Sequence, residues 1–331
     1  MKRKRIKTLF SHCMVFCCLI ALIVPAAMAG EDPSQFPSKP IQLTIGWSPG
    51  GGTDLSIRLL AKAAEKILGQ PIIIQNKPGG ASAAALMENK KARPDGYNLV
   101  SLNAIAACIV PHMRSVPYKA WDDFSPVMSY GEYVAMLAVQ ADQPWKTVDK
   151  FIEYAKKNPK VVTVGVSAIG ASAHLAVEWL AAKHNAKITF VPFGGGAPAV
   201  ASLLGGHITA SSTSGEVLPH VRAGKLRVLV TYSDYPLEGV GPVPSLPGKY
   251  GFDLSSWTGL AAPKGVPEPI LEKLDKAFKK AMEEESFIKG MKNLTMLASY
   301  TGHKELTAKI YKDYKAWGAL VKKLKIGLYK K

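Results

Sequence analysis

Two distant segments of the chain share one pattern: a short run of β-forming residues enters a small, polar, glycine-bearing loop, and a helical pattern follows. In the first segment, Ile41–Trp47 is the expected strand and Ser48–Asp54 is the loop. In the second, Val161–Val166 is the expected strand and Ser167–Ser172 is the loop. Because strands alternate with helices around both loops, the pattern predicts an α/β fold with a mostly parallel sheet covered on both faces.

The length of the chain and the spacing of these units predict two lobes that present similar loops to one another. Roughly 300 residues follow the N-terminal segment described below, which is more than one hydrophobic core usually supports. The last third has long amphipathic helices and little strand character, so we expect it to pack back on the first lobe. The expected lobes are residues 30–140 with 255–331, and residues 141–254, so the chain crosses between lobes twice and forms a hinge. The expected buried stripes of the C-terminal helices are Ile270, Leu271, Leu274, Phe278 and Ala281, and Leu306, Ile310, Tyr314, Trp317 and Val321.

The N-terminus has the three parts of a secretory signal peptide. Met1–Lys7 carries five cationic residues, Thr8–Pro25 is almost wholly apolar, and Ala27–Ala29 forms a small-x-small site before Gly30. The pattern predicts cleavage after Ala29 and a periplasmic location. A retained membrane anchor is the alternative, but polar residues interrupt the apolar stretch, and no later run approaches the ~20 apolar residues that a span needs.

The cysteine count changes when residues 1–29 are removed. Three of the four cysteines lie in that segment, and only Cys108 remains. A lone cysteine forms no intrachain disulfide, so the exported protein is expected to fold on core burial alone. Since its neighbours are apolar, Cys108 is expected to be a buried small hydrophobic residue rather than a catalytic thiol.

The charge balance is strongly basic, with a formal net charge of +17 for the whole chain. Removing the five N-terminal cationic residues leaves +12. The remaining basic residues form no arginine-rich block and no aromatic–basic alternation, so nucleic-acid binding is not expected. A positive field would steer anions toward a cleft, although a solvated basic surface explains the charge equally well.

The loop Ser48–Asp54 has the components of an anion site. Its glycines let the backbone approach a ligand and turn N–H groups toward it, and the start of the following helix carries a positive dipole end. Ser48 and Thr53 add hydroxyl groups. Asp54 is an anion at a helix start, where it is expected to cap the helix; direct contact with the ligand, or with a bridging water, stays open.

Three kinds of anion-binding loop share these components, and the sequence separates them. A phosphate-binding P-loop needs Gly-Lys-Ser/Thr, which occurs nowhere in the chain. A dinucleotide loop needs Gly-x-Gly-x-x-Gly, and Leu55 stands in the place of the third glycine. A carboxylate site needs only the loop, the hydroxyls and the helix start. We therefore expect a small carboxylate, held by N–H groups, hydroxyls and water, since no arginine lies in the expected loops.

The chain contains no complete catalytic or metal-binding pattern. Ser167 stands in a segment that departs from the nucleophile elbow Gly-x-Ser-x-Gly, because Ile169 replaces the second glycine. His174, on the helix that follows, is expected to pack rather than act as a general base. No His-Glu-x-x-His or Cys/His ligand spacing occurs. We expect no catalytic residue, no metal and no cofactor; a secreted α/β hydrolase using Ser167 and a ligand-sensing partner of a membrane receptor remain as alternatives.

An ordered series of short motifs covers nearly the whole chain after residue 36. The series is Pro37-Ser38-Lys39-Pro40-Ile41, Pro49-Gly50-Gly51-Gly52-Thr53-Asp54, Gly69-Gln70-Pro71, Asn76-Lys77-Pro78-Gly79, Pro94-Asp95-Gly96-Tyr97, Asp123-Phe124-Ser125-Pro126-Val127, Val191-Pro192-Phe193-Gly194-Gly195-Gly196-Ala197-Pro198, Leu204-Gly205-Gly206, Gly224-Lys225-Leu226-Arg227 and Trp257-Thr258-Gly259-Leu260-Ala261-Ala262-Pro263. In this order the motifs are specific. The chain resembles the periplasmic solute-binding components of tripartite tricarboxylate transporters, also called the Bug family.

The resemblance implies a two-lobed periplasmic binding protein-like fold of type II, a monomer that closes on a small carboxylate and presents it to membrane permease subunits. It implies one wall of the site at Ser48, Gly51, Gly52 and Thr53, with Asp54 beside it. It implies the other wall at Ser167, Gly170, Ala171 and Ser172, with Gly195 and Gly196 nearby. Trp47 precedes the first loop where the family commonly has Phe, and it either lines the pocket or packs.

Two segments depart from the family pattern. Gly79–Ala84 replaces a loop that is usually richer in glycine. Phe193–Gly195 replaces a usual Tyr-Lys-Gly, which removes a cation near the expected cleft. Both departures bear on which carboxylate is bound, and the sequence leaves its identity open.

Overall fold

The computed structural model describes residues 32–235, 237, 239–252 and 256–330. The chain divides into two compact units, Met1–Phe36 and Pro37–Lys331. The predicted signal peptide, residues 1–29, lies outside the described residues, and of the first unit only a short turn at residues 33–35 is assigned. The helices and strands of the described residues lie in the second unit. No helix among the described residues is both long enough and apolar enough to cross a membrane.

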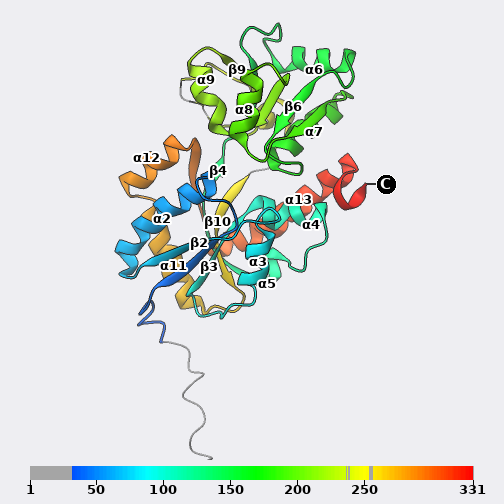
Figure 1. The fold of residues 1–331 in the computed structure, drawn as a ribbon. Helices are drawn as coiled ribbons and strands as arrows, with labels where there is room; N and C mark the ends of the chain where they lie inside the picture. The colour runs from blue at the N-terminus through cyan, green and yellow to red at the C-terminus, as the bar shows by residue number, and fades with distance from the viewer. Residues whose placement is uncertain (1–31, 236, 238, 253–255, 331) are drawn as a thin grey trace, which may run out of the picture. The chain divides into compact units, whose positions relative to one another are not determined.

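The first sheet of the second unit has six strands in the order β11-β4-β10-β3-β1-β2 (Figure 1). The strands are β1 (Ile41–Ile45), β2 (Ile72–Asn76), β3 (Asn98–Asn103), β4 (Phe124–Tyr133), β10 (Trp257–Pro263) and β11 (Met296–Gly302). β1 pairs in parallel with β2 and β3, whereas β10 pairs antiparallel with β3 and β4, and β11 antiparallel with β4. The prediction of a mostly parallel sheet was therefore wrong. The pattern detected only the strands joined by helical crossovers, and β10 and β11 run opposite to the other four strands.

The second sheet has five strands in the order β7-β6-β8-β5-β9. Its strands are β5 (Met136–Gln140), β6 (Thr163–Val166), β7 (Thr189–Pro192), β8 (Ala210–Thr213) and β9 (Leu226–Thr231). β6 pairs in parallel with β7 and β8, and β5 pairs antiparallel with β8 and β9. Two mixed sheets with helices make an α/β fold of two domains, as the sequence predicted.

The chain passes between the sheets twice, which agrees with the predicted hinge. It leaves the first sheet at Tyr133 and joins the second at Met136, ahead of the expected boundary after residue 140. It leaves the second sheet at Thr231 and rejoins the first at Trp257.

The helices follow the predicted units, with differences at their ends. α2 begins at Gly52 rather than near Leu55, and it ends where Gly69 adopts a left-handed conformation with φ 68°. The described helices are α2 (Gly52–Leu68), α3 (Ala83–Asn89), the π-helix η2 (Ile105–Ile109), α4 (Val110–Met113), α5 (Ala120–Asp123), α6 (Val148–Lys157), α7 (Ser172–Lys183), α8 (Gly196–Leu204), the 3₁₀ helix η3 (Gly215–Val217), α9 (Leu218–Arg222), α10 (Leu246–Tyr250), α11 (Glu268–Ala281), α12 (Glu285–Asn293), α13 (His303–Leu324) and the 3₁₀ helix η4 (Gly327–Tyr329).

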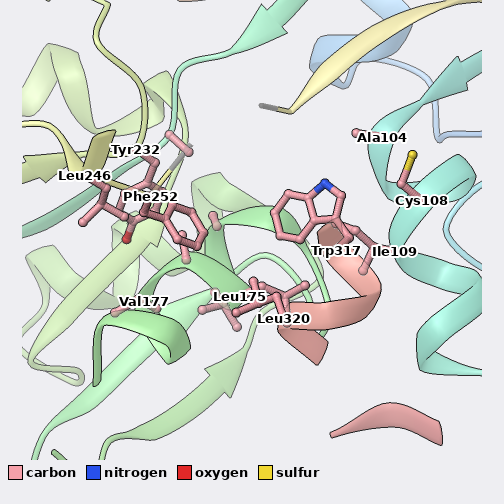
Figure 2. Close-up of a cluster of buried hydrophobic side chains, with 14 of the residues drawn as sticks. Ala104, Cys108, Ile109, Leu175, Val177, Tyr232, Leu246, Phe252, Trp317 and Leu320 are labelled. Carbon is pink, nitrogen blue, oxygen red and sulfur yellow. The ribbon is translucent and has the colours of Figure 1, made fainter. Parts of the chain in front are cut away.

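The C-terminal helix α13 contacts both parts of the second unit. It packs against β4 and η2, and also against α7, which follows the second sheet's β6. Trp317 and Leu320 of α13 lie beside Leu175 of α7 in one buried cluster (Figure 2). The predicted apolar stripe of α13 is buried apart from Tyr314, which is half-buried, and the whole predicted stripe of α11 is buried. The cluster also contains Cys108, whose thiol is free and buried, as expected.

Candidate functional site

The first predicted loop is an exposed backbone segment at the start of α2. β1 ends at Ile45, and Ser48–Gly51 are exposed to solvent. Gly50 has φ 81°, a left-handed conformation that glycine adopts without strain. Gly51 is the residue at the helix start, and no side chain accepts a hydrogen bond from the first turn there. The first N–H groups of α2 thus lack a capping side chain, which is the arrangement that helix-terminal anion sites use.

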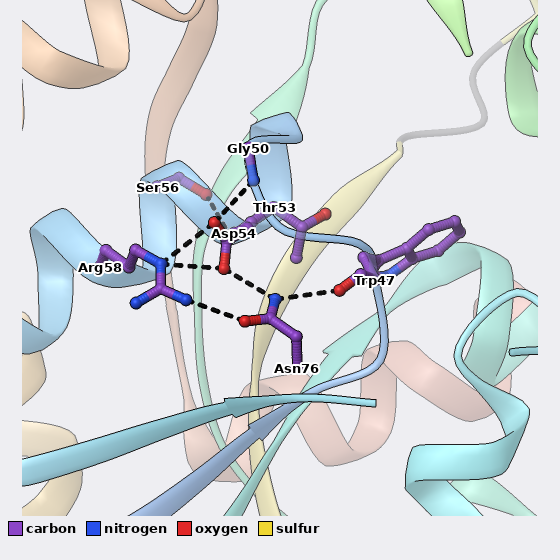
Figure 3. Close-up of polar contacts among 7 residues, drawn as sticks. All are labelled: Trp47, Gly50, Thr53, Asp54, Ser56, Arg58 and Asn76. Carbon is purple, nitrogen blue, oxygen red and sulfur yellow. Dashed lines mark hydrogen bonds and ion pairs between the residues drawn. The ribbon is translucent and has the colours of Figure 1, made fainter. Parts of the chain in front are cut away.

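Asp54 lies in the first turn of α2, where protein donors surround its carboxylate (Figure 3). The Gly50 N–H donates to Oδ2 at 2.9 Å, and Nε of Arg58 lies 3.0 Å from both oxygens. Asn76 of β2 donates from Nδ2 to Oδ1 of Asp54 at 2.8 Å and to the carbonyl of Trp47 at 3.0 Å. The side chain is only 2% exposed. The network therefore ties the loop, α2 and β2 together. The prediction that Asp54 caps the helix was wrong, because no side chain accepts from the first N–H groups of α2 and its carboxylate is bonded to Gly50, Arg58 and Asn76 instead.

Electrostatics favour a charged Asp54. Burial acts to raise its pKa, but hydrogen bonds from Arg58, Gly50 and Asn76 outweigh burial, so the pKa lies below the usual 3.8. The carboxylate is ionised at neutral pH, and both of its oxygens accept hydrogen bonds from protein donors. Direct contact between Asp54 and a ligand stays a prediction.

Thr53 joins the first turn of α2 to the end of β4. Its buried side chain forms a short hydrogen bond through Oγ1 with the hydroxyl of Tyr133. A Cβ built on Gly52 would lie 3.4 Å from Cε1 of Tyr133, so the phenol ring rests against the helix start. The pKa of Tyr133 is raised to about 12, mainly by burial. The hydrogen bond with Thr53 lowers the pKa, and the negative charge of Glu216 raises it further. Tyr133 is thus a neutral hydroxyl beside the predicted site, at the first crossing.

The loop before α8 lies against a carboxylate that the sequence analysis did not identify. A Cβ built on Gly196 would lie 2.3 Å from Oε1 of Glu216, which leaves room only for glycine unless the glutamate moves. Next to Glu216, Gly215 closely approaches Thr295, the residue before β11 of the first sheet. A Cβ built on Gly52 would lie 3.8 Å from Sδ of Met296, the residue after Thr295, so the Gly195–Gly196 loop and the start of α2 both lie near the start of β11.

The second predicted loop is fixed by the helix that follows it. Gly170 is buried with φ 84°, and its N–H donates to Nδ1 of His174 at 3.1 Å. His174 is 4% exposed and packs edge-on against Phe190, as the sequence predicted. Burial lowers the pKa of His174 to about 4, so the ring is neutral at pH 7. The Gly170 N–H is therefore used within the protein, while Ala168 and Ile169 stay exposed.

Ser172 is the predicted site residue that reaches the second crossing. Its hydroxyl lies 2.9 Å from that of Ser256, immediately before β10. Both serines line a small pocket together with residues of both crossings. The other lining residues are Glu132, Tyr133, Ala135, Ala173, Ala176, Tyr232, Ser233 and Phe252. This pocket lies at the hinge.

Two buried polar atoms beside the first loop have no hydrogen-bond partner within the described structure. They are Nε1 of Trp47 and Oγ of Ser82. Ser82 packs directly on Gly46, because a Cβ there would lie 1.8 Å from the Ser82 hydroxyl oxygen. Ser82 and Ala81 both have positive φ angles, 74° and 49°, in the loop where the family usually has more glycine. The indole of Trp47 points away from the Asp54 network (Figure 3).

The remaining predicted positions give no sign of catalytic chemistry. Across the described residues, no group of three or more His, Cys, Asp and Glu could hold a metal ion. Ser167 is half-buried and forms no hydrogen bond with a histidine of the described structure. Nδ1 of His174 already accepts a hydrogen bond from the Gly170 N–H. Ser48, Gly51, Gly52 and Thr53 stand together at α2, and Ser167, Gly170, Ala171 and Ser172 stand together before and at α7. Sequence reasoning missed three residues that contact the predicted positions: Tyr133, Glu216 and Ser256.

Comparisons with known proteins place this arrangement in a family. The model of the tripartite tricarboxylate transporter family receptor matches residues 56–326. The chain is 33% identical over 305 residues to the UPF0065 protein in the gbd 5' region of Cupriavidus necator, covering 92% of this chain and 93% of that protein. It is 32% identical over 265 residues to protein BugT of Bordetella pertussis, covering 78% and 81%.

Solved structures agree with the sequence comparisons. A TctC solute binding protein from Polaromonas has 32% identity and a TM-score of 0.73, with 87% of this chain and 99% of that chain covered. MatC from Rhodopseudomonas palustris, solved with bound malate, has 26% identity and a TM-score of 0.75, with 86% and 100% covered. The chain belongs to the tripartite tricarboxylate transporter receptor family, also called the Bug family, whose members are periplasmic solute-binding proteins.

Proposed function

We propose that this receptor captures a small organic carboxylate and delivers it to the membrane permease subunits of a tripartite tricarboxylate transporter. The observation that carries the proposal is the uncapped start of α2, which follows an exposed glycine loop and has no side chain that accepts from its first N–H groups. The bound malate of MatC, a relative at 26% identity, supports a carboxylate as the ligand class. The protein works as a monomer without a cofactor, and it is not an enzyme.

The first wall of the site is the loop Ser48–Thr53. Backbone N–H groups and the hydroxyl of Ser48 would face the ligand carboxylate, and the helix dipole would stabilise its charge. The Asp54 network holds the loop in this conformation before the ligand arrives, which reduces the entropy lost on binding. Asp54 holds the loop through its hydrogen bond with the Gly50 N–H. Trp47 has a buried indole N–H that finds no acceptor within the described structure.

The second wall is formed by residues before and at the starts of α7 and α8. It comprises Ser167, Gly170, Ala171, Ser172, Gly195 and Gly196. Because its amide is bonded to His174, Gly170 contributes its left-handed turn rather than a donor. Capture occurs when the lobe that contains the first sheet and the lobe that contains the second sheet close about the two crossings.

Delivery to a permease requires export. We propose that residues 1–29 direct the chain to the periplasm and are removed after Ala29. Mass spectrometry of the protein from a periplasmic extract would measure the mature mass. A chain that begins at Gly30 supports this proposal, and an intact N-terminus contradicts it.

A thermal-shift screen of organic acids tests the ligand class. A ligand that binds only the native state adds RT ln(1 + [L]/Kd) to the free energy of unfolding, so at least one carboxylate should raise Tm in a concentration-dependent way. Uncharged amides of the same acids are the matched controls and should give no shift. Failure of every acid, or equal shifts with the amides, would contradict carboxylate capture.

Delivery is tested separately by uptake. A host lacking the receptor gene should lose uptake of the stabilising acid and regain it with the wild-type receptor. Unchanged uptake in the deletion strain would contradict the transport role while leaving binding intact. Co-purification with a membrane receptor instead of the permease would favour ligand sensing. Turnover of esters that Ser167→Ala abolishes would favour the hydrolase.

A further inference from the structure

The carboxylate of Glu216 lies directly on the backbone at the start of α8. A Cβ built on Gly196 would lie 2.3 Å from Oε1, 2.5 Å from Cδ and 2.8 Å from Oε2 of this glutamate. The whole carboxylate group therefore covers the Cα of Gly196, in the space that a side chain would fill. A ligand group that approaches Gly196 meets a negative charge there.

Glu216 also lies close to the first part of the site. The adjacent Gly215 packs on Thr295, because a Cβ there would lie 2.2 Å from Cβ of Thr295. The hydroxyl of Tyr133, which bonds Thr53 at the start of α2, lies within reach of the Glu216 charge. The glutamate thus stands between the second-wall loop and the end of the first-wall loop.

The charge of Glu216 is uncompensated. Its side chain is exposed, and it forms no hydrogen bond or ion pair with any residue that the structure describes. Asp54, in contrast, is neutralised by Arg58. The loop before α8 carries no cation either, because it consists of Phe193, Gly194 and Gly195. The second wall is therefore negative at this point.

A negative wall discriminates between ligands that share one carboxylate. If the first carboxylate is held at the start of α2, a second carboxylate near Gly196 would face Glu216 and be repelled. An ammonium group in the same place would form a charge-assisted hydrogen bond, which is stronger than a bond between neutral groups.

We infer that Glu216 is a specificity-determining residue that accepts a hydrogen bond from an ammonium group of the ligand, so that the receptor prefers an amino carboxylate to the same acid without its ammonium group. The inference rests on the proposed carboxylate capture at Ser48–Thr53 and names the ligand class within it.

Isothermal titration calorimetry with matched acid pairs tests the inference. The probes are L-aspartate with succinate, L-glutamate with glutarate, and 4-aminobutyrate with butyrate, since the members of each pair differ only in the ammonium group. In the wild-type protein, the aminated member of a binding pair should have a Kd at least about tenfold lower. Glu216→Gln keeps the shape of the side chain and removes its charge, so it should abolish most of this preference while leaving the plain acid bound equally or more tightly.

Glu285→Gln is the control, because Glu285 is an exposed glutamate at the start of α12, apart from the contacts of Glu216. It should keep the wild-type preference. Equal binding of both members to the wild type, or an unchanged preference in Glu216→Gln, would overturn the role of Glu216 while carboxylate capture stands. Absence of binding by all six probes would instead contradict carboxylate capture together with the inference.

Discussion

Nε of Arg58 lies 3.0 Å from both carboxylate oxygens of Asp54, one helical turn earlier on α2. The same carboxylate accepts from Gly50 in the loop and from Asn76 in β2. A single buried anion therefore fixes the glycine loop, the start of α2 and the neighbouring strand relative to one another. The rigidity of the proposed first wall depends on this arrangement.

Asp54→Asn should lower the free energy of unfolding by about 1–3 kcal/mol, because the donors that converge on the carboxylate lose their charged acceptor. Urea denaturation at pH 7 measures the change. Asp142→Asn, at an exposed turn position, is the matched control and should change stability by less than about 0.5 kcal/mol. An Asp54→Asn protein as stable as the control would show that the network does not hold the loop.

The same network predicts an acid transition. The native pKa of Asp54 lies below the usual 3.8, since its hydrogen bonds outweigh the opposing effect of burial. Its contribution to stability is therefore fully present above the unfolded pKa and is lost as the pH falls through the lower native pKa. The stability difference between wild type and Asp54→Asn should shrink below about pH 4. A difference that stays constant down to pH 2.5 would contradict the lowered pKa.

His174 predicts a second pH dependence at milder acidity. Burial lowers its native pKa from 6.5 to about 4, so the unfolded chain binds a proton in this window and the native protein does not. Stability should fall as the pH decreases from about 6.5 to 4, by up to about 1.4 kcal/mol per pH unit. His174→Gln should remove this component when unfolding is measured at several pH values. Identical slopes in the two proteins would mean that His174 is protonated in the native state.

Tyr133 and Tyr130 lie on the same strand, and removing their hydroxyl groups should have different effects on ligand affinity and on stability. Tyr133→Phe removes the partner of the Thr53 hydroxyl at the ligand loop, so the Kd of a bound carboxylate should rise severalfold. Tyr130→Phe removes a hydroxyl that lies 2.9 Å from Ser56 in the interior, so it should cost about 1 kcal/mol of stability and leave the Kd unchanged. Calorimetry and urea denaturation on both variants measure the two quantities. Equal effects of the two variants on the Kd would exclude a local role of Tyr133.

Trp47→Phe removes one N–H group and keeps an aromatic ring. Because Nε1 of Trp47 is buried without an acceptor, its loss should leave the free energy of unfolding unchanged or raise it by up to about 1 kcal/mol. If the ligand supplies the missing acceptor, the Kd should rise about tenfold. An unchanged Kd would assign Trp47 to packing, the other role that the sequence left open.

The local pattern of residues in the sequence was enough to predict the strand and helix around the first loop and the burial of His174. The strand near Ile41, the helix that ends at Gly69 and the packing of His174 all follow from periodicity, glycine placement and neighbouring apolar residues. β4 and β10 escaped detection because nearly all their residues are buried, which removes the alternation that marks a strand. Strand direction could not be predicted either, since it depends on pairing between segments more than a hundred residues apart.

The candidate site was predictable in its loops but not in what surrounds them. Tyr133 meets Thr53 only because β4 leads into the first crossing, and no local pattern contains that contact. The position of Glu216 could have been predicted from the sequence. β8 is followed by Ser214 and Gly215, which is the same order of strand, small polar residue and glycine as in the other loops. That the Gly170 N–H is bonded to His174 required the helix geometry of α7.

We propose that the glycine loop at the start of α2 binds the ligand carboxylate. The most direct test is calorimetric titration of the acid that stabilises the wild type into Gly51→Asp. Gly51 has room for a side chain, because its Cβ would meet only the carbonyl of Ser48 at 3.6 Å, so the variant should fold and place a negative charge in the site. Gly241→Asp, at an exposed glycine with no atom near its Cβ, is the control. We predict that Gly51→Asp loses binding by at least about a hundredfold, roughly 2.7 kcal/mol, while Gly241→Asp binds like the wild type. A wild-type Kd in Gly51→Asp would place the carboxylate elsewhere.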